Sequence, residues 1–317
     1  MLKSAPRLAS PMRFSLAFPH TQPIDAIDGL RSLARLASFG RREDVDDADA
    51  AVAALLAVDG QGAAPLAAAG AGLDVSGAYV LRADPVTFVA GRDDVLLAGR
   101  VDDLSDEHAA SLVATLGKHF AQDGIAFHAP RADAWFALAS AHVPVEADPP
   151  RTDQPIGARL PRGPHGATWR RWLSEMQMLL HEHPVNAARE ALGQAPVTGI
   201  WISGGGRPPA SLTIAPTAIH ATPSRSGDVV IGIAQIANVP VTPPSSTFDA
   251  LSLAGDAVVV VPRVDDIAAF ERDWLAPAVA ALERGAIAHL TVVSAGARTL
   301  RHASSRPSWW RRLRTAR

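Results

Sequence analysis

Residues 169–206 carry the strongest structural signal of the chain; they read WRRWLSEMQMLLHEHPVNAAREALGQAPVTGIWISGGG. An α-helix turns by about 100° per residue, so Trp169, Trp172 and Met176 share one apolar face. A stripe of tryptophan, methionine and leucine at this spacing is typical of a helix that faces a core. The pattern therefore predicts a helix over residues 168–182 that packs against a sheet.

A proline interrupts this helical pattern and starts a second one. Pro184 disfavours the α conformation at His183, but proline itself suits the first position of a helix. We therefore predict a short helix from Pro184 to Leu192, with His183 near its N-cap and with Asn186 and Arg189 on one face. The N–H groups at a helix N-terminus are free to bind anions, so this turn is a candidate anion site.

A run of glycines follows the strand predicted over residues 197–202. Residues 204–206 are all glycine, which lets the backbone approach a ligand or a neighbouring segment closely. Two interpretations stay open, a tight structural turn and a ligand loop, because the run lacks the Gly-x-x-x-x-Gly-Lys-Ser/Thr phosphate loop. The predicted ligand-binding residues are His181, His183, Asn186, Arg189, Gly204, Gly205 and Gly206.

The two histidines that flank Glu182 do not have the spacing of a metal pair. His181 and His183 are two residues apart, which places their side chains about 200° apart on a helix. A spacing of four would bring two imidazoles to one ion, as in the zinc-binding His-Glu-x-x-His pattern. The sequence therefore predicts no metal and no cofactor, and it identifies no catalytic residue.

An acidic run near the N-terminus could be a cation site or a solvated loop. We interpret it as a solvated loop whose carboxylates favour the N-terminus of the next helix. The residues of this run are Glu43, Asp44, Asp46, Asp47 and Asp49.

The chain as a whole predicts an α/β fold of mixed α+β type. A small β-α-β unit follows a helical N-terminal region, and a stretch rich in Pro, Asp and Arg separates it from a sheet with helices on both faces. The predicted divisions are a helical region at 1–74, a small α+β unit at 75–145, a linker at 146–163, an α/β domain at 164–300 and a basic tail at 301–317.

Within the predicted α/β domain, apolar runs alternate with helical patterns. Strands that are apolar on both faces indicate a sheet covered on both sides. A helix is expected over residues 265–284, with a kink at Pro277. After the strand at 197–202, further strands are expected at 211–214, 229–234, 257–261 and 288–293.

Composition excludes several classes of protein. The chain has 317 residues, of which 48% are hydrophobic and 20% charged, and its formal net charge is −2. These values are ordinary for a globular protein and argue against a disordered chain or a domain built mainly to hold nucleic acid. The absence of cysteine excludes disulfides and thiolate sites. No apolar run of signal-peptide length follows the first basic residues, so we expect a cytoplasmic protein.

The C-terminal tail is basic and aromatic. Residues 301–317 contain six arginines and no acid, together with Trp309 and Trp310. The tail is interpreted as a solvated end whose tryptophans dock on the protein itself. The alternative is contact with an anionic surface.

The strings LSEMQMLLHEHPVNAARE and PVTGIWISGGG resemble the bacterial RpfE-type regulatory proteins, many of which are called cofactor-independent phosphoglycerate mutases. The resemblance is strongest over residues 168–206. It is weaker at 81–86 (LRADPV), at 118–130 (KHFAQDGIAFHAP) and at the final WWRR.

The resemblance and the residues together lead to two expected functions. The first is a regulatory or ligand-binding protein that holds a small anionic metabolite, or a protein partner, near the predicted ligand-binding residues. The second is an isomerase of the phosphoglycerate mutase type. Metal-dependent mutases place a serine nucleophile between two divalent cations held by Asp and His clusters, and no such array is apparent in this sequence.

Overall fold

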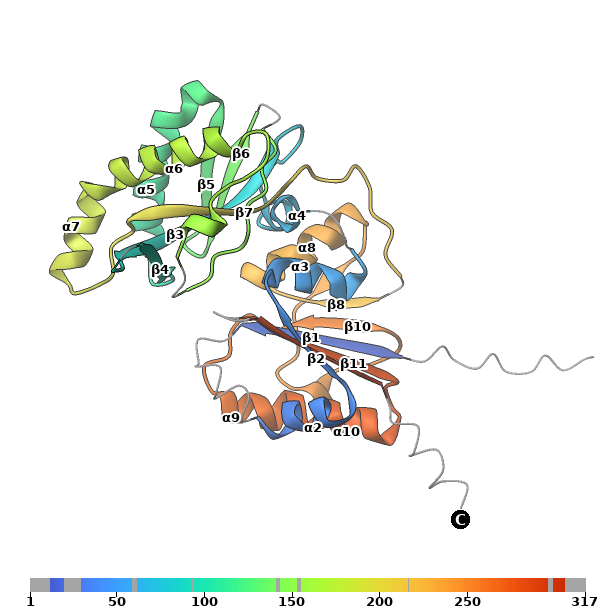
Figure 1. Cartoon of the computed structure of the whole chain (residues 1–317). Coiled ribbons are helices and arrows are strands. Elements are labelled where there is room, and N and C mark those ends of the chain that lie inside the picture. The colour runs from blue at the N-terminus through green and yellow to red at the C-terminus, as the bar shows by residue number, and fades with distance from the viewer. Residues whose placement is uncertain are drawn as a thin grey trace, which may run out of the picture.

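The computed structural model describes residues 12–19, 30–58, 62–92, 94–140, 143–152, 155–215, 217–295 and 299–305. These residues form alternating layers of helices and sheets. A large sheet and a small sheet have one layer of helices between them, and each sheet is covered on its other face by further helices (Figure 1).

The large sheet is mostly parallel. Its central strand β1 (Arg13–Pro19) runs parallel to both neighbours. At one edge of the sheet, the strand next to the outermost one runs antiparallel to both of its neighbours. In spatial order the strands are β2 (Arg41–Val45), β12 (Thr299–Ser305), β11 (His289–Ala295), β1, β10 (Ala257–Val260), β8 (Ala218–His220) and β9 (Val241–Thr242).

The small sheet is antiparallel and is organised around the long strand β3 (Tyr79–Ala90). Val86 of β3 pairs with Arg100 on one side and with Gly199 on the other, so β4 and β7 flank β3. The remaining strands of this sheet are β4 (Val95–Arg100), β5 (Ile125–Arg131), β6 (Ala134–Ala139) and β7 (Gly199–Gly206).

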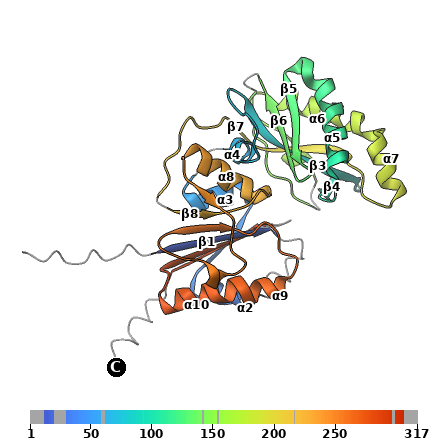
Figure 2. The ribbon, with the colours of Figure 1, turned by 180° about the vertical axis from the view of Figure 1, so that it is seen from behind.

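The helices that cover the outer faces belong to separate hydrophobic clusters. Behind the large sheet, one cluster joins strand and helix residues such as Leu16, Leu33 and Leu282 (Figure 2). On the small sheet, Trp169 and Leu112 pack against Leu81. The outer helices are α2 (Arg31–Phe39), α9 (Ile267–Phe270) and α10 (Ala276–Arg284) on the large sheet, and α5 (Asp106–Phe120), α6 (Gly166–His181) and α7 (Pro184–Ala191) beside the small one.

The middle layer is shared by both sheets. One hydrophobic cluster contains Ala17 of the large sheet, Val80 and Phe136 of the small sheet, and Leu66 and Val229 of the helices between them. The middle helices are α3 (Ala48–Ala53), α4 (Ala63–Gly70) and α8 (Arg225–Ile236).

Glycines allow α4 and α8 to touch backbone to backbone. A Cβ at Gly232 would lie 1.8 Å from the carbonyl oxygen of Leu66, and a Cβ at Gly70 would lie 1.9 Å from that of Asp228. Both distances are far below van der Waals contact, so only glycine fits at these two positions. The close approach of α4 and α8 therefore depends on the missing side chains.

Several sequence predictions are confirmed. The fold is mixed α/β, and the helix predicted over residues 168–182 is α6. The break at Pro184 is present as expected: His183 is the N-cap of α7, and Pro184 is in the first turn of that helix.

Two strand predictions were wrong. Residues 229–234 lie in α8, which starts where the Ser224 side chain accepts a hydrogen bond from the Gly227 N–H. Their β-branched, apolar composition favours a strand, but a helix buried between two sheets is apolar on most sides as well. Residues 211–214 form no strand, although Leu212 and Ile214 pack against the middle core.

Other local differences concern the N-terminal region and the last helix. Residues 1–74, expected to be helical, also contain β1 and β2 of the large sheet. The helix expected over 265–284 is interrupted by the π-helical turn Glu271–Leu275, and Pro277 follows it at the start of α10. The π-helical turn is wider than an α-helical one, so it leaves room for the Pro277 ring, which the interior of an α-helix would not accommodate.

The strand pairing groups the chain differently from the predicted divisions. Segments 13–45 and 218–305 contribute the large sheet, while α6, α7 and β7 join the small sheet formed by residues 79–139. The predicted linker at 146–163 therefore lies within the part of the chain that builds the small sheet. The domain boundaries themselves stay a prediction.

The remaining predictions concern membranes and the tail. None of the helices in the described ranges is long and apolar enough to cross a lipid bilayer. Of the basic tail, Arg301 lies in β12, where its Nη1 is 3.4 Å from Glu43 Oε2. Residues 306–317, with both tail tryptophans, lie outside the described residues.

The helix contact in the middle layer can be tested with paired glycine substitutions. Gly232→Ala is expected to lower the free energy of unfolding by at least about 2 kcal/mol, because the added methyl group overlaps the Leu66 carbonyl. Gly117→Ala on α5 meets no atom within 4 Å, so it should stabilise the protein by about 1 kcal/mol through helix propensity. Urea denaturation followed by circular dichroism measures both, and equal effects would contradict the packing described.

Candidate functional site

The predicted residue His183 is a structural N-cap. Its Nδ1 accepts a hydrogen bond from the Val185 N–H at 3.2 Å, so the neutral ring carries its proton on Nε2. That nitrogen lies 3.0 Å from Thr115 Oγ1 and donates to it, while the Thr115 hydroxyl donates to the Ser111 carbonyl at 3.2 Å. Burial lowers the pKa of His183, which favours this neutral form. The imidazole thus has no free lone pair with which to activate Thr115.

Asn186 and Arg189 also bond to the protein itself. The Asn186 amide donates to the carbonyls of Leu180 and Val197, at 2.7 and 2.8 Å, and its oxygen accepts from the Val197 N–H at 2.8 Å. Arg189 is fully buried; its Nε donates to the Ala195 carbonyl and its Nη2 lies 2.5 Å from Asp103 Oδ1. Both side chains fasten α7 to the segments around it.

The glycine run lies at the far end of β7. It is neither a tight turn nor a free loop, because β7 extends through Gly206. A Cβ at Gly62 would lie 2.2 Å from the Gly205 carbonyl oxygen, so the start of α4 sits directly on this strand end. Extended strand separates Val197 from Gly204 by roughly 20 Å.

The structure therefore does not bring the seven predicted ligand-binding residues into one pocket. His183, Asn186 and Arg189 are buried and hydrogen-bonded within the protein, His181 is exposed, and the glycines pack against α4. Ligand binding by these residues stays a prediction, without a cavity that joins them.

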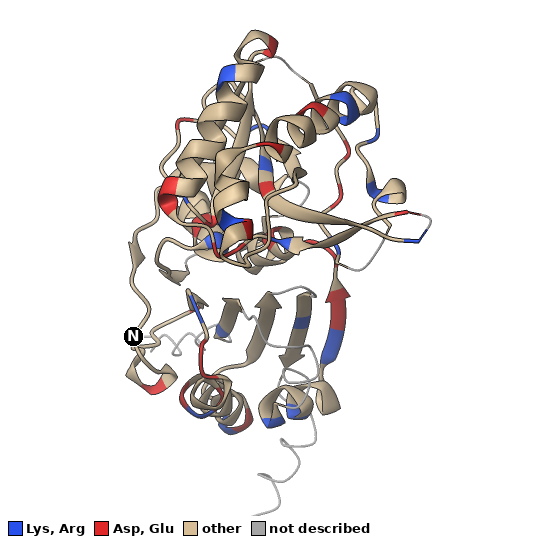
Figure 3. Ribbon diagram, turned by 90° about the vertical axis from the view of Figure 1, so that its left-hand side faces the viewer, with Lys and Arg blue, Asp and Glu red and all other residues tan. Residues whose placement is uncertain are grey.

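A different group of charged residues lies where the middle helices meet the small sheet (Figure 3). Both α3, which follows β2, and α8, which follows β8, begin at the carboxyl edge of the large sheet, since β2 and β8 run in the same direction as β1. Ligands of open α/β sheets bind at this edge. We call this group the crevice cluster; it consists of Asp49, Arg82, Asp84, Arg131, Arg225 and Asp228.

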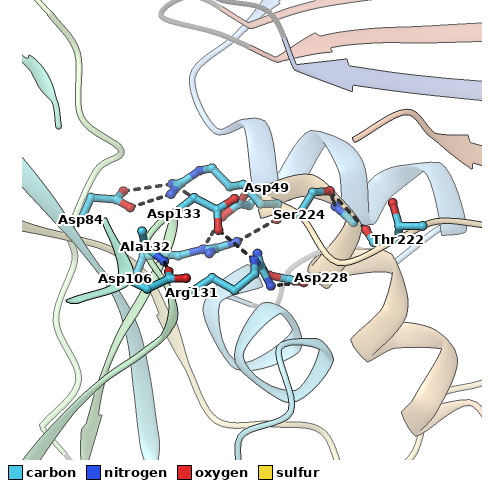
Figure 4. Close-up of polar contacts among 12 residues, drawn as sticks. Asp49, Asp84, Asp106, Arg131, Ala132, Asp133, Thr222, Ser224 and Asp228 are labelled. Carbon is cyan, nitrogen blue, oxygen red and sulfur yellow. Dashed lines mark hydrogen bonds and ion pairs between the residues drawn. The ribbon is translucent and has the colours of Figure 1, made fainter. Parts of the chain in front are cut away.

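Two pairs of the crevice cluster have the forked geometry of a strong arginine–carboxylate interaction. Arg225 contacts Asp84 through both terminal nitrogens, at 2.5 and 2.9 Å, and Arg131 contacts Asp228 in the same way, at 3.2 and 2.7 Å (Figure 4). Each pair joins α8 to a strand of the small sheet. Asp84 and Asp228 are almost completely buried, so the carboxylates of both pairs are shielded from solvent.

The third pair is the most deeply buried. Arg82 Nε lies 2.8 Å from Asp49 Oδ2, and Arg82 Nη2 donates to the Arg225 carbonyl at 3.1 Å. The guanidinium carbon stands 4.8 Å from the ring centroid of Phe136. Within the described part of the chain, Arg82 Nη1 and Asp49 Oδ1 are buried without a hydrogen-bond partner.

Burial and neighbouring charges shift the pKa values of Asp84 and Asp228 in opposite directions. Burial opposes ionisation of Asp84, but Arg225 and Arg100 outweigh it and hold the pKa of Asp84 below its ordinary value. At Asp228, burial outweighs the effect of Arg131 and raises the pKa. For Arg225, the aspartates outweigh burial and raise the pKa, so its guanidinium stays charged.

The crevice cluster does not fit a divalent metal. No three Asp, Glu or His side chains in the described ranges gather in a way that could hold an ion. The carboxylates of the cluster instead face guanidinium groups.

Sequence reasoning missed the crevice cluster and misjudged one of its members. Asp47 does favour the next helix as expected, because its side chain caps α3 and accepts from the Ala50 N–H. Asp49, predicted to be solvated, is only 6% exposed and pairs with Arg82. A usable signal was the alternation of Arg82 and Asp84 with apolar residues in LRADPV, which places both charges on one face of a buried strand.

The opposite pKa shifts predict opposite pH dependence for two matched substitutions. Asp84 has a lowered pKa, so its ionised form stabilises the fold above about pH 4, and this contribution is lost as the pH falls below that. Asp84→Asn should therefore cost about 3 kcal/mol at pH 7, and the cost should fall as the pH is lowered from 4 to 3. Asp228 has a raised pKa, so Asp228→Asn should become less destabilising as the pH rises from 3 to 7.

Urea denaturation at several pH values measures both variants. Asp265→Asn is the control, since Asp265 pairs with Arg263 on the surface, where both side chains are more than 70% exposed. It should change stability by less than about 1 kcal/mol at either pH. Parallel pH profiles for the two buried aspartates would contradict the electrostatics described.

Comparison with known proteins gives a family match for part of the chain. Among solved structures, the cofactor-independent phosphoglycerate mutase from Thermoplasma acidophilum DSM 1728 is 17% identical, with a TM-score of 0.40 and coverage of 93% of this chain and 90% of that one. The PH0037 protein from Pyrococcus horikoshii is 14% identical, with a TM-score of 0.46 and coverage of 94% and 88%. No curated protein matches the chain significantly. Residues 49–186, which run from α3 into α7, match the family model of 2,3-bisphosphoglycerate-independent phosphoglycerate mutase, so this part of the chain is similar to that family.

Proposed function

We propose that this chain is a cytoplasmic regulatory or ligand-binding protein of the RpfE type, which binds a small phosphorylated anion at the carboxyl edge of the large sheet without converting it. The observation that carries the proposal is the partnering of the crevice cluster. Its carboxylates are held by arginines, while the arginines supply the planar donor groups that also recognise phosphate.

Two of these arginines are accessible to a solute. The side chains of Arg131 and Arg225 are 28% and 20% exposed, whereas Arg82 is buried. A phosphorylated anion would contact their exposed edges beside the N-terminus of α8, where the helix dipole also favours negative charge. A protein partner, or an anionic surface for the basic tail, is a further proposal that the fold leaves open.

The second candidate function is a phosphoglycerate mutase-type isomerase, which the family match favours. That chemistry needs a hydroxyl that an adjacent base or metal ion activates. At this edge, the Ser224 hydroxyl donates to the Thr222 carbonyl at 3.3 Å and accepts from the Gly227 N–H at 3.1 Å. Both contacts give Ser224 a capping role, and we therefore favour binding over turnover.

A coupled assay with 3-phosphoglycerate, with and without manganese, separates the two functions. The purified full chain is expected to show no turnover, because the crevice cluster offers neither a free nucleophile nor a metal-binding set of carboxylates. Turnover that depends on manganese would refute the regulatory proposal and establish the mutase.

A thermal-shift panel of phosphorylated metabolites tests binding directly. A ligand present at a hundred times its Kd should stabilise the fold by about 2.7 kcal/mol, which raises the Tm by several degrees. Arg131→Gln should weaken the apparent affinity for the ligand at least tenfold. Arg263→Gln, a matched charge change at an exposed pair, should leave that affinity unchanged. A flat response across the panel would remove the small-anion form of the proposal.

A further inference from the structure

We infer that the crevice cluster takes no divalent cation and that the guanidinium groups of Arg82, Arg131 and Arg225 are its resident positive charges. Any phosphorylated ligand bound there is therefore held independently of metal. The last statement rests on the proposed function; the first stands on the geometry of the crevice cluster alone.

The carboxylate oxygens that a metal would need already face guanidinium groups. Both oxygens of Asp84 accept from Arg225, and both oxygens of Asp228 accept from Arg131. At Asp49, Oδ2 contacts Arg82 and only Oδ1 has no partner in the described part of the chain. Hard divalent cations require several oxygen ligands at one point, and Asp49 Oδ1 is the one carboxylate oxygen of the cluster that has no hydrogen-bond partner in the described residues.

Displacing an arginine to free a carboxylate would leave a buried charge unpaired. Arg82 is 1% exposed and its guanidinium stands over the Phe136 ring, so displacing it would break that contact. Arginine also stays protonated throughout the physiological pH range, so it cannot vacate the site by losing its charge. An added divalent cation would lie beside three fixed positive charges that three carboxylates already balance.

The positions of these charges are set by the fold rather than by loops. Arg82 and Asp84 lie on β3, Arg131 ends β5, and Arg225 and Asp228 are in the first turns of α8. The aspartates sit where a metal ligand would be expected, at the edge used by ligands of α/β sheets. The fixed guanidinium groups therefore provide at this edge the positive charge that a metal would otherwise bring.

Equilibrium dialysis of the full chain against 100 μM Mn²⁺, without any metabolite, tests the inference. We expect fewer than 0.1 equivalents bound at this edge and a Tm that changes by less than 1 °C between manganese and EDTA. Binding of about one equivalent that is lost in Asp84→Asn or Asp228→Asn, but retained in Asp265→Asn, would overturn the inference. Binding that persists in both buried-aspartate variants places the ion elsewhere and supports it.

A second measurement uses the unmodified protein, in case the variants do not fold. Fe²⁺ with ascorbate and peroxide generates hydroxyl radicals at a bound metal, which cleave the adjacent backbone. We expect no cleavage within residues 82–84 or 225–228, and cleavage there would overturn the inference.

Ligand binding is measured separately from metal binding. If a phosphorylated metabolite raises the Tm, its apparent affinity should agree within a factor of two with and without EDTA. A shift abolished by EDTA would refute metal-independent binding. If no metabolite shifts the Tm, the proposed function fails, but the manganese and cleavage results still decide the inference.

Discussion

The backbone contact between α4 and α8 is the constraint on which the rest of this structure depends. With Gly70 and Gly232 in contact across it, the two helices approach each other closely and share one hydrophobic cluster with both sheets. Any side chain at these positions would push the helices apart and disturb that cluster. Asp228 lies on α8 one turn before Gly232. The contact between the helices therefore also positions Asp228 relative to the small sheet.

The three arginine–aspartate pairs follow from that arrangement. Each pair crosses from a middle helix to a strand of the small sheet, at an interface that also contains an apolar cluster. Apolar surfaces of similar shape can slide past one another at little cost, whereas forked ion pairs tolerate one alignment. Buried pairs of this kind add little net stability compared with apolar packing, but breaking one of them is costly. Their effect here is to fix the register of α8 against β3 and β5.

Much of the small sheet's outer layer could be predicted from sequence, because its signals are local. Pro184 and the apolar stripe of α6 each act within one or two helical turns, and both appear as expected. The errors arise where burial on all sides erases the periodicity, as in residues 229–234 of α8. The crevice cluster was missed for a related reason: its partners are 33 to 143 residues apart, so no local spacing reports them.

The predicted ligand-binding residues show how one sequence pattern can serve two purposes. Polar side chains after a helix break, such as Asn186 and Arg189, suit ligand recognition, but they equally suit the capping of exposed carbonyls where α6, α7 and β7 meet. Buried backbone N–H and C=O groups at a helix break need hydrogen-bond partners. Neither a helix nor a sheet supplies those partners at the break, so side chains do. The polar residues near Pro184 are therefore explained by the break itself, and the chemistry available to a ligand lies where the middle helices begin and their charges meet those of the small sheet.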